Sequence, residues 1–232
     1  MQSSVEILLQ DSRIWRGSDW QLTARPGLPS GFAELDAALP GQGWPGASVI
    51  ELQHDTHGLG EIRLLWPALA ALTANAGEVA LIDPPWIPYA PAWAAAGVKL
   101  QHLLWLSSAG GDEGRLWAFE QCLRSGGCAA ALLWLTQEPD SRSWRRLQLA
   151  AEAGDCIGWV MLLSAQVRQA SPVALRLRLS QQSVPQLQIL KRRGPPLLRP
   201  VLLPQLDALA ECLPSPRQPA PSALRLHWCK ER

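Results

Sequence analysis

The sequence predicts an α/β fold, in which a mostly parallel, twisted sheet is flanked by helices and ends in antiparallel strands. Five short apolar runs alternate with segments of helical periodicity, which is typical of a parallel sheet covered on both faces. Two runs of alternating apolar and polar residues follow, and their period of two indicates strands with one solvent-facing side. With 232 residues and 47% hydrophobic side chains, the chain can bury a sizeable core.

The first half of the chain provides two strands and the helices around them. Residues 47–52 (ASVIEL) and 79–82 (VALI) are apolar and lie between glycine- and proline-containing turns, as buried strands do. Ser30 can cap a helix that runs to Leu39, and a longer helix is expected over residues 62–76. The loop between the first strand and this longer helix is rich in glycine and polar residues.

The second half continues the same alternation of strands and helices. Three further apolar runs predict strands at residues 102–106, 129–135 and 157–163. Helical segments lie before or between them, at residues 91–96, 113–125 and 143–153. Ser141 or Ser143 is expected to cap the last of these helices.

The two alternating runs near the end predict an antiparallel pair of strands. They read ALRLRLS at residues 174–180 and QLQILK at residues 186–191. Because Leu occupies every second position of the first run, Arg176 and Arg178 are expected to face solvent.

The composition divides the chain into three parts. Residues 1–24 form an N-terminal helix and linker, residues 25–206 the α/β core, and residues 207–232 a Pro-rich tail that we expect to be flexible. The start of the chain lacks the pattern of a secretory signal, and no apolar run reaches the roughly 18 residues that cross a bilayer. A cytoplasmic protein without membrane contact is therefore expected.

Cysteine and histidine usage gives no indication of a metal or a disulfide framework. The five cysteines are odd in number, irregularly spaced and without a CxxC pair, so we expect reduced thiols. His54 and His57 could supply half of a metal site, but no cluster of further ligands follows them. We expect no metal and no other cofactor.

Charge is distributed unevenly along the chain. Residues 1–100 carry 5 Lys/Arg and 10 Asp/Glu, whereas residues 101–232 carry 16 and 10, so the first part is acidic and the second basic. No acidic residue lies between Asp155 and Asp207. Such separation is typical of a chain that contacts a partner at one end or associates with itself, although a basic span can also be a solvated surface.

The order of several motifs resembles the core of the RecA family. The resemblance rests on SGFAELDAAL, GQGWPGASVIEL, VALIDPP, LRSGGCAAALLWL and SPVALRLRLS with QLQILKRRG. Within this superfamily the chain most resembles the ImuA family, the SulA-like, RecA-related proteins of bacterial mutagenesis cassettes. The segments that carry this closer resemblance are DSRIWRG, LPSGFAELDAALPGQGWP, HGLGEIRLLWPALA and ILKRRGPP.

The nucleotide loop that this resemblance implies is degenerate. It comprises His54, Asp55, Thr56, His57, Gly58, Leu59, Gly60 and Glu61. Glu61 and Ile62 stand where a phosphate-binding loop has its lysine and hydroxyl, and a carboxylate repels phosphate. Pro85 replaces the catalytic glutamate, and Trp134 the aspartate that helps to hold magnesium. We expect no ATPase activity; Glu61 would instead stabilise the following helix from its N-terminus.

The resemblance implies a non-catalytic accessory role in SOS-induced translesion DNA synthesis. Its expected partners are an ImuB-type inactive homologue of Y-family polymerases and an error-prone C-family polymerase, with RecA, single-stranded DNA and a second copy of the chain as further partners. The alternative is a SulA-type division inhibitor that binds FtsZ, although the N-terminal extension and KRRGPP lie outside that resemblance.

Two sets of residues are candidates for contacts. The DNA-binding candidates are Arg142, Arg145, Arg146, Arg168, Arg176, Arg178, Lys191, Arg192 and Arg193. The protein-interface candidates are Val5, Leu8, Leu9, Ile14, Trp15 and Trp20.

The chain has twelve tryptophans. Their neighbours in the sequence predict that some are buried in the core and that others contact a partner. Those expected in the core are Trp66, Trp105, Trp117, Trp134 and Trp159. Trp44 lies near a turn and is expected, like Trp15 and Trp20, to anchor a contact. Trp86 and Trp93 flank a proline-rich loop and fit either place.

Overall fold

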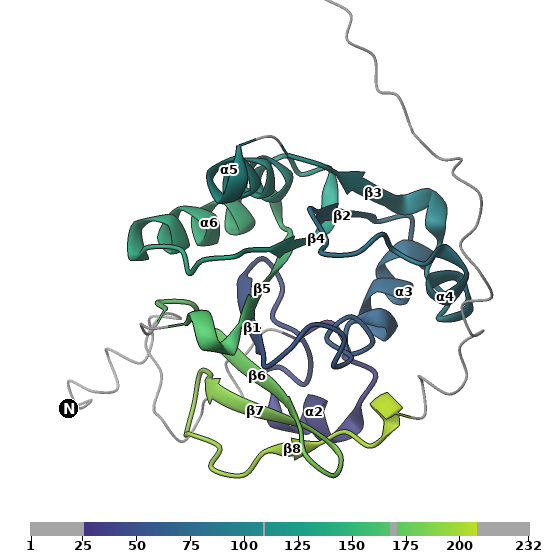
Figure 1. Ribbon diagram of the computed structural model, residues 1–232, viewed down its shortest axis with the longest axis vertical. Helices are drawn as coiled ribbons and strands as arrows, with labels where there is room; N and C mark the ends of the chain where they lie inside the picture. The colour runs from purple at the N-terminus through teal and green to yellow at the C-terminus, as the bar shows by residue number, and fades with distance from the viewer. Residues whose placement is uncertain (1–25, 109, 168–170, 208–232) are drawn as a thin grey trace, which may run out of the picture.

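An eight-stranded sheet runs through the computed structural model, which describes residues 26–108, 110–167 and 171–207 (Figure 1). The strand order is β3-β2-β4-β5-β1-β6-β7-β8. Neighbouring strands from β3 to β6 are parallel, and the β6–β7 and β7–β8 pairs are antiparallel. The predicted fold class, an α/β sheet that ends antiparallel, is confirmed.

The seven predicted strands all form, with small shifts at their ends. They are β1 Val49–His54, β2 Glu78–Ile82, β3 Leu103–Leu106, β4 Cys128–Trp134, β5 Ile157–Leu163, β6 Leu175–Gln181 and β7 Pro185–Lys191. The sequence did not predict β8, Val201–Leu202, because two residues are too few to show a period. In β8 Val201 pairs with Leu187 of β7.

Helices cover both faces of the sheet, as the alternation of strands and helices predicted. The helices are α2 Ala33–Ala38, α3 Trp66–Ala74, α4 Ala90–Ala95, α5 Gly111–Arg124 and α6 Ser141–Gly154, with single 3-10 turns η2 Leu100–His102 and η3 Ser164–Gln166. Side chains of α2, α3 and α4 pack in one core layer and those of α5 and α6 in the other. Figure 1 shows the α5–α6 pair on the opposite side of the sheet from α3 and α4.

Two helix beginnings differ from the prediction. Asp140, rather than Ser141 or Ser143, caps α6, and its Oδ1 accepts a hydrogen bond of 2.7 Å from the Ser143 N–H. Aspartate caps a helix as well as serine does, and here it lies one residue earlier. The helix expected from residue 62 begins only at Trp66, because residues 61–65 form turns and Pro67 occupies the first turn of α3.

The tryptophans divide into buried and exposed sets, partly against expectation. Trp66, Trp134 and Trp159 are buried as predicted. Trp44 is fully buried edge-to-face against Trp159, with ring centroids 5.8 Å apart, so its predicted role as an exposed anchor is wrong. Trp105 is exposed on β3, which is an edge strand of the sheet as far as the structure describes it.

The parallel arrangement brings the loops that follow five of the strands to one edge of the sheet. The strands β1, β2, β4, β5 and β6 all end at this side, which we call the carboxyl edge. Strand β7 runs the other way, so it ends at the opposite side, the amino edge. Ligands of open α/β sheets bind outside the carboxyl ends of the strands, so a site is expected at this edge.

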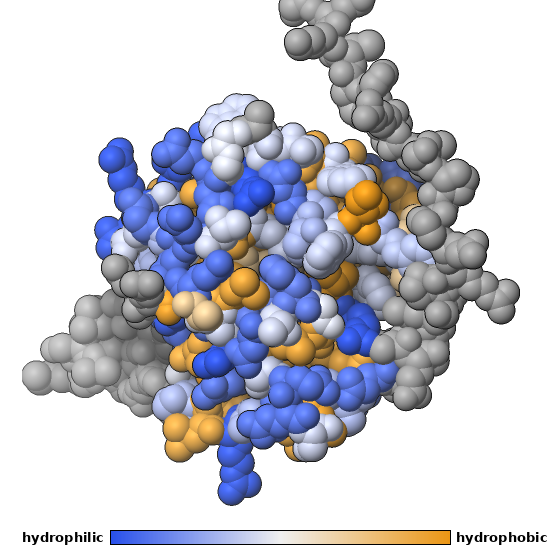
Figure 2. Space-filling model, viewed as in Figure 1, coloured by the Kyte–Doolittle hydropathy of each residue, from blue (hydrophilic) through white to orange (hydrophobic). Residues whose placement is uncertain are grey.

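No described helix is long and apolar enough to cross a membrane. On the face seen in Figure 2, hydrophobic residues lie scattered among hydrophilic ones and form no continuous belt. The described cysteines, Cys122, Cys128 and Cys156, are free, and Cys128 and Cys156 are buried.

Candidate functional site

The loop after β1 turns sharply with the help of two glycines. Gly58 and Gly60 adopt positive φ angles of 85° and 101°, a conformation that favours glycine. Their N–H groups point toward the side chain of Glu61 and donate hydrogen bonds to Oε1 (3.0 Å) and Oε2 (3.1 Å) respectively. The carboxylate is almost entirely buried.

Glu61 therefore occupies the loop's own anion-binding position. Successive backbone N–H groups of such a turn form a concavity that binds anions, and phosphate-binding loops use it for phosphate. Here the anion is covalently attached to the chain. A phosphate in the same place would have to displace the carboxylate and would meet its charge at short range.

The predicted stabilisation of a helix by Glu61 is wrong. The α3 helix begins at Trp66, so Glu61 lies ahead of its first turn, where the macrodipole has little effect. Its partners are the loop N–H groups of Gly58 and Gly60. The carboxylate thus stabilises the loop itself.

His54 lies buried at the end of β1, next to this loop. Its Nδ1 is 3.1 Å from the carbonyl oxygen of Thr56, and its Nε2 has no hydrogen-bond partner among the described residues. Burial lowers the pKa of His54, although the nearby Glu61 carboxylate acts in the opposite direction. The imidazole is therefore neutral near pH 7.

His54 and His57 lie side by side, but no described residue joins them to complete a metal site. The two rings lie 5.0 Å apart between centroids. Within the ranges that the structure describes, no group of three His, Cys, Asp or Glu residues is placed to hold a metal ion.

The two other positions of the degenerate site supply no catalytic carboxylate. Pro85 is exposed in the loop after β2, and Trp134 is buried at the end of β4. The carboxylate beside Pro85, that of Asp83, is engaged elsewhere: it accepts from the N–H of Ser108 (3.1 Å) and from Nε of Arg115 (3.3 Å).

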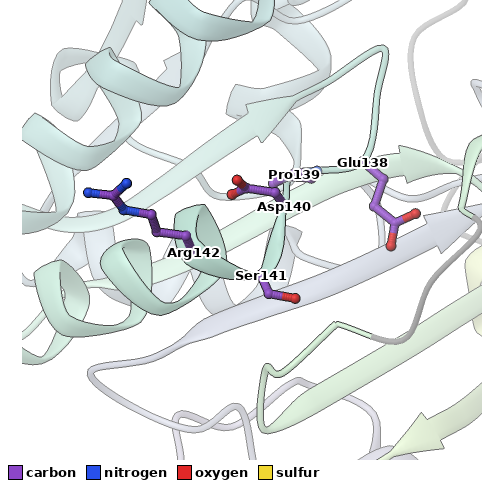
Figure 3. A pocket seen from close by; sticks show the side chains of 5 residues that line it. All are labelled: Glu138, Pro139, Asp140, Ser141 and Arg142. Carbon is purple, nitrogen blue, oxygen red and sulfur yellow. The ribbon is translucent and has the colours of Figure 1, made fainter.

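Three basic candidates, Arg142, Arg145 and Arg146, lie at the carboxyl edge on the first turns of α6. All three are exposed, but Arg146 forms an ion pair of 2.6 Å with Glu120 of α5. Arg142 also lines a depression of about 450 Å³ together with Glu138, Pro139, Asp140 and Ser141. In Figure 3 Arg142 and Glu138 extend from this depression in opposite directions.

Arg176 and Arg178 both pair with carboxylates, and of the two only Arg178 is exposed as predicted. Only 13% of the Arg176 side chain is exposed, and its Nε lies 3.1 Å from Oε2 of the buried Glu51, so the expectation that it faces solvent is wrong. Arg178 is partly exposed and pairs with Asp55 at 2.8 Å. Both guanidinium groups thus compensate carboxylates of β1 and its loop.

Lys191, Arg192 and Arg193 lie at the amino edge, because β7 runs antiparallel to β6. Lys191 Nζ donates to the carbonyl of Pro172 (3.1 Å), and Arg192 donates to the carbonyls of Pro195 (2.9 Å) and Ala38. Burial lowers the pKa of Arg192. Among the described candidates, Arg142, Arg145 and Arg146 thus lie at the carboxyl edge, and Lys191, Arg192 and Arg193 at the opposite edge.

The remaining candidates lie outside the described residues. These are Arg168 and the protein-interface candidates Val5, Leu8, Leu9, Ile14, Trp15 and Trp20.

Trp86 fitted either the core or an interface by sequence, and it is among the most exposed large apolar side chains that the structure describes, together with Ile87. Trp117, which the sequence placed in the core, lies on the solvent side of α5. The proline residues around Trp86 were the available signal, because a proline-rich segment rarely packs inside a core.

Comparison with known proteins finds similar solved structures but no matching family. No protein-family model matches the chain, and no curated protein matches it. Among solved structures it is similar to SulA from Pseudomonas aeruginosa, with 22% sequence identity and a TM-score of 0.41. That similarity covers 50% of this chain and 98% of the SulA chain.

Proposed function

We propose that this chain is a non-catalytic RecA-like accessory protein that works through protein contacts in the cytoplasm. The observation that carries the proposal is the Glu61 carboxylate, which is hydrogen-bonded to the N–H groups of Gly58 and Gly60. A loop that supplies its own anion keeps its shape without a nucleotide. The exposed proline at position 85 and the buried Trp134 support the same conclusion.

The process we propose is SOS-induced translesion DNA synthesis. It is supported by the resemblance to the ImuA family, which is carried by HGLGEIRLLWPALA and ILKRRGPP among other segments. The chain would connect an ImuB-type inactive polymerase homologue with an error-prone C-family polymerase, with RecA and single-stranded DNA as additional partners.

Titration with ATP and magnesium in a calorimeter tests the absence of nucleotide chemistry. We expect no affinity tighter than about 1 mM, which corresponds to roughly 4 kcal/mol of binding free energy. ATP hydrolysis should not exceed the rate without protein. Micromolar ATP binding that Gly60→Asp abolishes would contradict the proposal.

Binding to separate purified partners tests the proposed process. The immobilised full chain is exposed in turn to the polymerase homologue, the C-family polymerase, RecA and FtsZ. Saturable binding of the polymerase homologue supports the proposal. Binding of FtsZ alone supports a SulA-type division inhibitor instead.

A further inference from the structure

Three cysteines lie near one another at the amino edge of the sheet. Cys122 is in the last turn of α5, Cys128 is the first residue of β4, and Cys156 directly precedes β5. Because β4 and β5 pair in parallel, they start at the same edge. Cys128 and Cys156 are buried in the core layer beneath α5 and α6, Cys122 packs against that layer, and all three thiols are free.

A tight turn brings Cys122 and Cys128 together. The chain passes from α5 to β4 through Ser125, Gly126 and Gly127, and Gly126 has a positive φ of 68°. The Ser125 hydroxyl donates to the carbonyl of Cys122 (3.0 Å) and accepts from the N–H of Gly127 (3.1 Å). Ser125 therefore stabilises the turn that returns the chain from one cysteine to the other.

The thiols of Cys122 and Cys128 face each other, and Cys122 donates a hydrogen bond to the Cys128 sulfur. This hydrogen bond lowers the pKa of Cys128, because the donor stabilises the thiolate, and it raises the pKa of Cys122. The Ser125 hydroxyl also lowers the pKa of Cys128, whereas burial and the Glu78 carboxylate act in the opposite direction. Burial raises the pKa of Cys156 to about 12. Because the thiolate is the reactive form, Cys128 is the most nucleophilic of the three.

The cysteine pair lies directly beneath an exposed part of the surface. Residues 124–127 are exposed, Cys122 is half-buried, and Cys128 is 8% exposed, whereas Cys156 is fully buried. The three thiols do not form a metal site, since no described group of three His, Cys, Asp or Glu residues is placed to hold one. A nucleophilic thiol beside a second thiol is instead the arrangement that oxidation converts to a disulfide.

We propose that Cys122 and Cys128 form a reversible oxidation site, at which a peroxide joins their sulfur atoms in a disulfide. The Cys128 thiolate attacks one oxygen of hydrogen peroxide: an S–O bond forms, the O–O bond breaks, and the hydroxide that leaves takes up a proton to become water. The Cys122 sulfur then attacks the sulfur of the Cys128 sulfenic acid. The S–S bond forms, the S–O bond breaks, and the hydroxyl group leaves as a second water with the Cys122 proton.

In sum, two thiols lose two electrons and the peroxide gains them. A dithiol reductant reverses the change, because its own thiols are oxidised to a disulfide as those of the protein are restored. The inference goes beyond the proposed function, since it concerns a modification of the chain and requires neither a polymerase nor DNA.

Mass spectrometry of the full chain tests the oxidation site. The protein is treated with hydrogen peroxide, its remaining thiols are alkylated, and it is digested with trypsin. Because trypsin cleaves after Arg124, Cys122 and Cys128 fall in separate peptides, residues 116–124 and 125–142. The expected product is these two peptides joined, lighter than their sum by two hydrogen atoms and separated again by dithiothreitol.

The rate of this link is compared with that of links to the third cysteine. The link between Cys122 and Cys128 should form at least about 10-fold faster than any link that includes Cys156, whose thiol remains protonated. Equal rates, or oxidation of Cys128 to the sulfinic acid without a link, overturn the inference.

Two variants assign the roles of the thiols. In Cys122→Ser the second thiol is absent, so Cys128 should stop at the sulfenic acid, which dimedone labels. Cys156→Ala is the matched control, and it should form the link within about 2-fold of the wild-type rate. Circular dichroism verifies that both variants fold. An unmodified Cys128 in Cys122→Ser, or loss of the link in folded Cys156→Ala, overturns the inference.

Discussion

Glu61 shows how a single side chain can replace a ligand. Its carboxylate lies one peptide unit from the Gly60 N–H that it accepts from, so it occupies the loop at a very high effective concentration. A free anion would have to compete with this tethered group. The loop therefore has an acceptor for both N–H groups without any bound ligand.

Replacing Glu61 by alanine should destabilise the protein. The N–H groups of Gly58 and Gly60 would lose their acceptor, and an unsatisfied buried donor costs about 1–3 kcal/mol. Urea denaturation measures the change in unfolding free energy. The exposed Glu113 is the control, and Glu113→Ala should cost less than about 0.5 kcal/mol. Equal losses of unfolding free energy in the two variants would mean that the Glu61 hydrogen bonds do not stabilise the fold.

His54 should make the protein less stable in mild acid. Burial lowers its folded-state pKa, whereas the unfolded chain has the ordinary value of about 6.5. Below that pH the imidazole is protonated in the unfolded state but still neutral in the folded state. The free energy of unfolding therefore falls as the pH drops toward the folded-state pKa.

A His54→Gln variant isolates this effect. Glutamine keeps an N–H donor for the Thr56 carbonyl but does not titrate. Melting temperatures between pH 8 and pH 5 should fall less steeply in the variant than in the wild type. Parallel curves would assign the acid sensitivity to other groups.

At the scale of elements, helix packing depends on one glycine where α6 ends. A Cβ added at Gly154 would lie 2.0 Å from the carbonyl oxygen of Leu123 at the end of α5. Because that neighbour is backbone, the two helices would have to separate. Gly154 thus permits the close contact between α5 and α6.

Gly154→Ala should therefore destabilise the fold by about 1–3 kcal/mol, the usual cost of overpacking. Gly46 provides the comparison, because a Cβ there has no neighbour within 4 Å. Gly46→Ala should change the unfolding free energy by less than about 0.5 kcal/mol. Thermal denaturation at one pH compares the melting temperatures of the two variants. Similar melting temperatures would show that α5 and α6 can move apart at little cost in free energy.

The sequence predicted the strands well because each is a continuous apolar or alternating run. IGWVMLL, for example, became β5 with the expected bounds, Ile157–Leu163. It predicted helix beginnings less well, since Asp140 and its neighbours Ser141 and Ser143 are all good caps. Which of the three residues caps α6 depends on the path of the loop between β4 and α6.

The residues of the candidate site can be named from the sequence, but its geometry cannot. Glu61, Pro85 and Trp134 are visible in the sequence, whereas the hydrogen bonds that Gly58 and Gly60 donate to Glu61 are not. Arg176 was misplaced for a related reason: its partner Glu51 lies 125 residues earlier, on a neighbouring strand. Alternation indicates which side of a strand a residue faces and says nothing about what covers that side.

On the scale of the whole molecule, exposed basic residues lie at two opposite edges of the sheet, and DNA binding is expected at only one of them. Arg142 and Arg145 are exposed at the carboxyl edge, whereas Arg192 and Arg193 follow β7 at the amino edge. We expect weak binding of single-stranded DNA that falls steeply with salt, as backbone contacts do. Arg142→Glu/Arg145→Glu should abolish it at low salt.

The corresponding pair at the amino edge is the control for DNA binding. Arg192→Glu/Arg193→Glu reverses the same number of charges and should leave most of the binding in place. Fluorescence anisotropy of a labelled oligonucleotide measures both. The opposite result would place the DNA at the amino edge.

The position of β1 in the sheet has a consequence for synthesis of the chain. Of the strands that the structure describes, β1 leaves the ribosome first, yet its neighbours are β5 and β6: Val49 pairs with Gly158, and Ile50 with Leu175. A half-translated chain therefore carries an apolar strand with both edges open, which favours aggregation and chaperone binding. Ribosome-bound chains stalled at increasing lengths should become resistant to protease only after β6 has left the exit tunnel. Resistance that already appears when β4 has emerged would mean that β1 finds a temporary partner among the earlier strands.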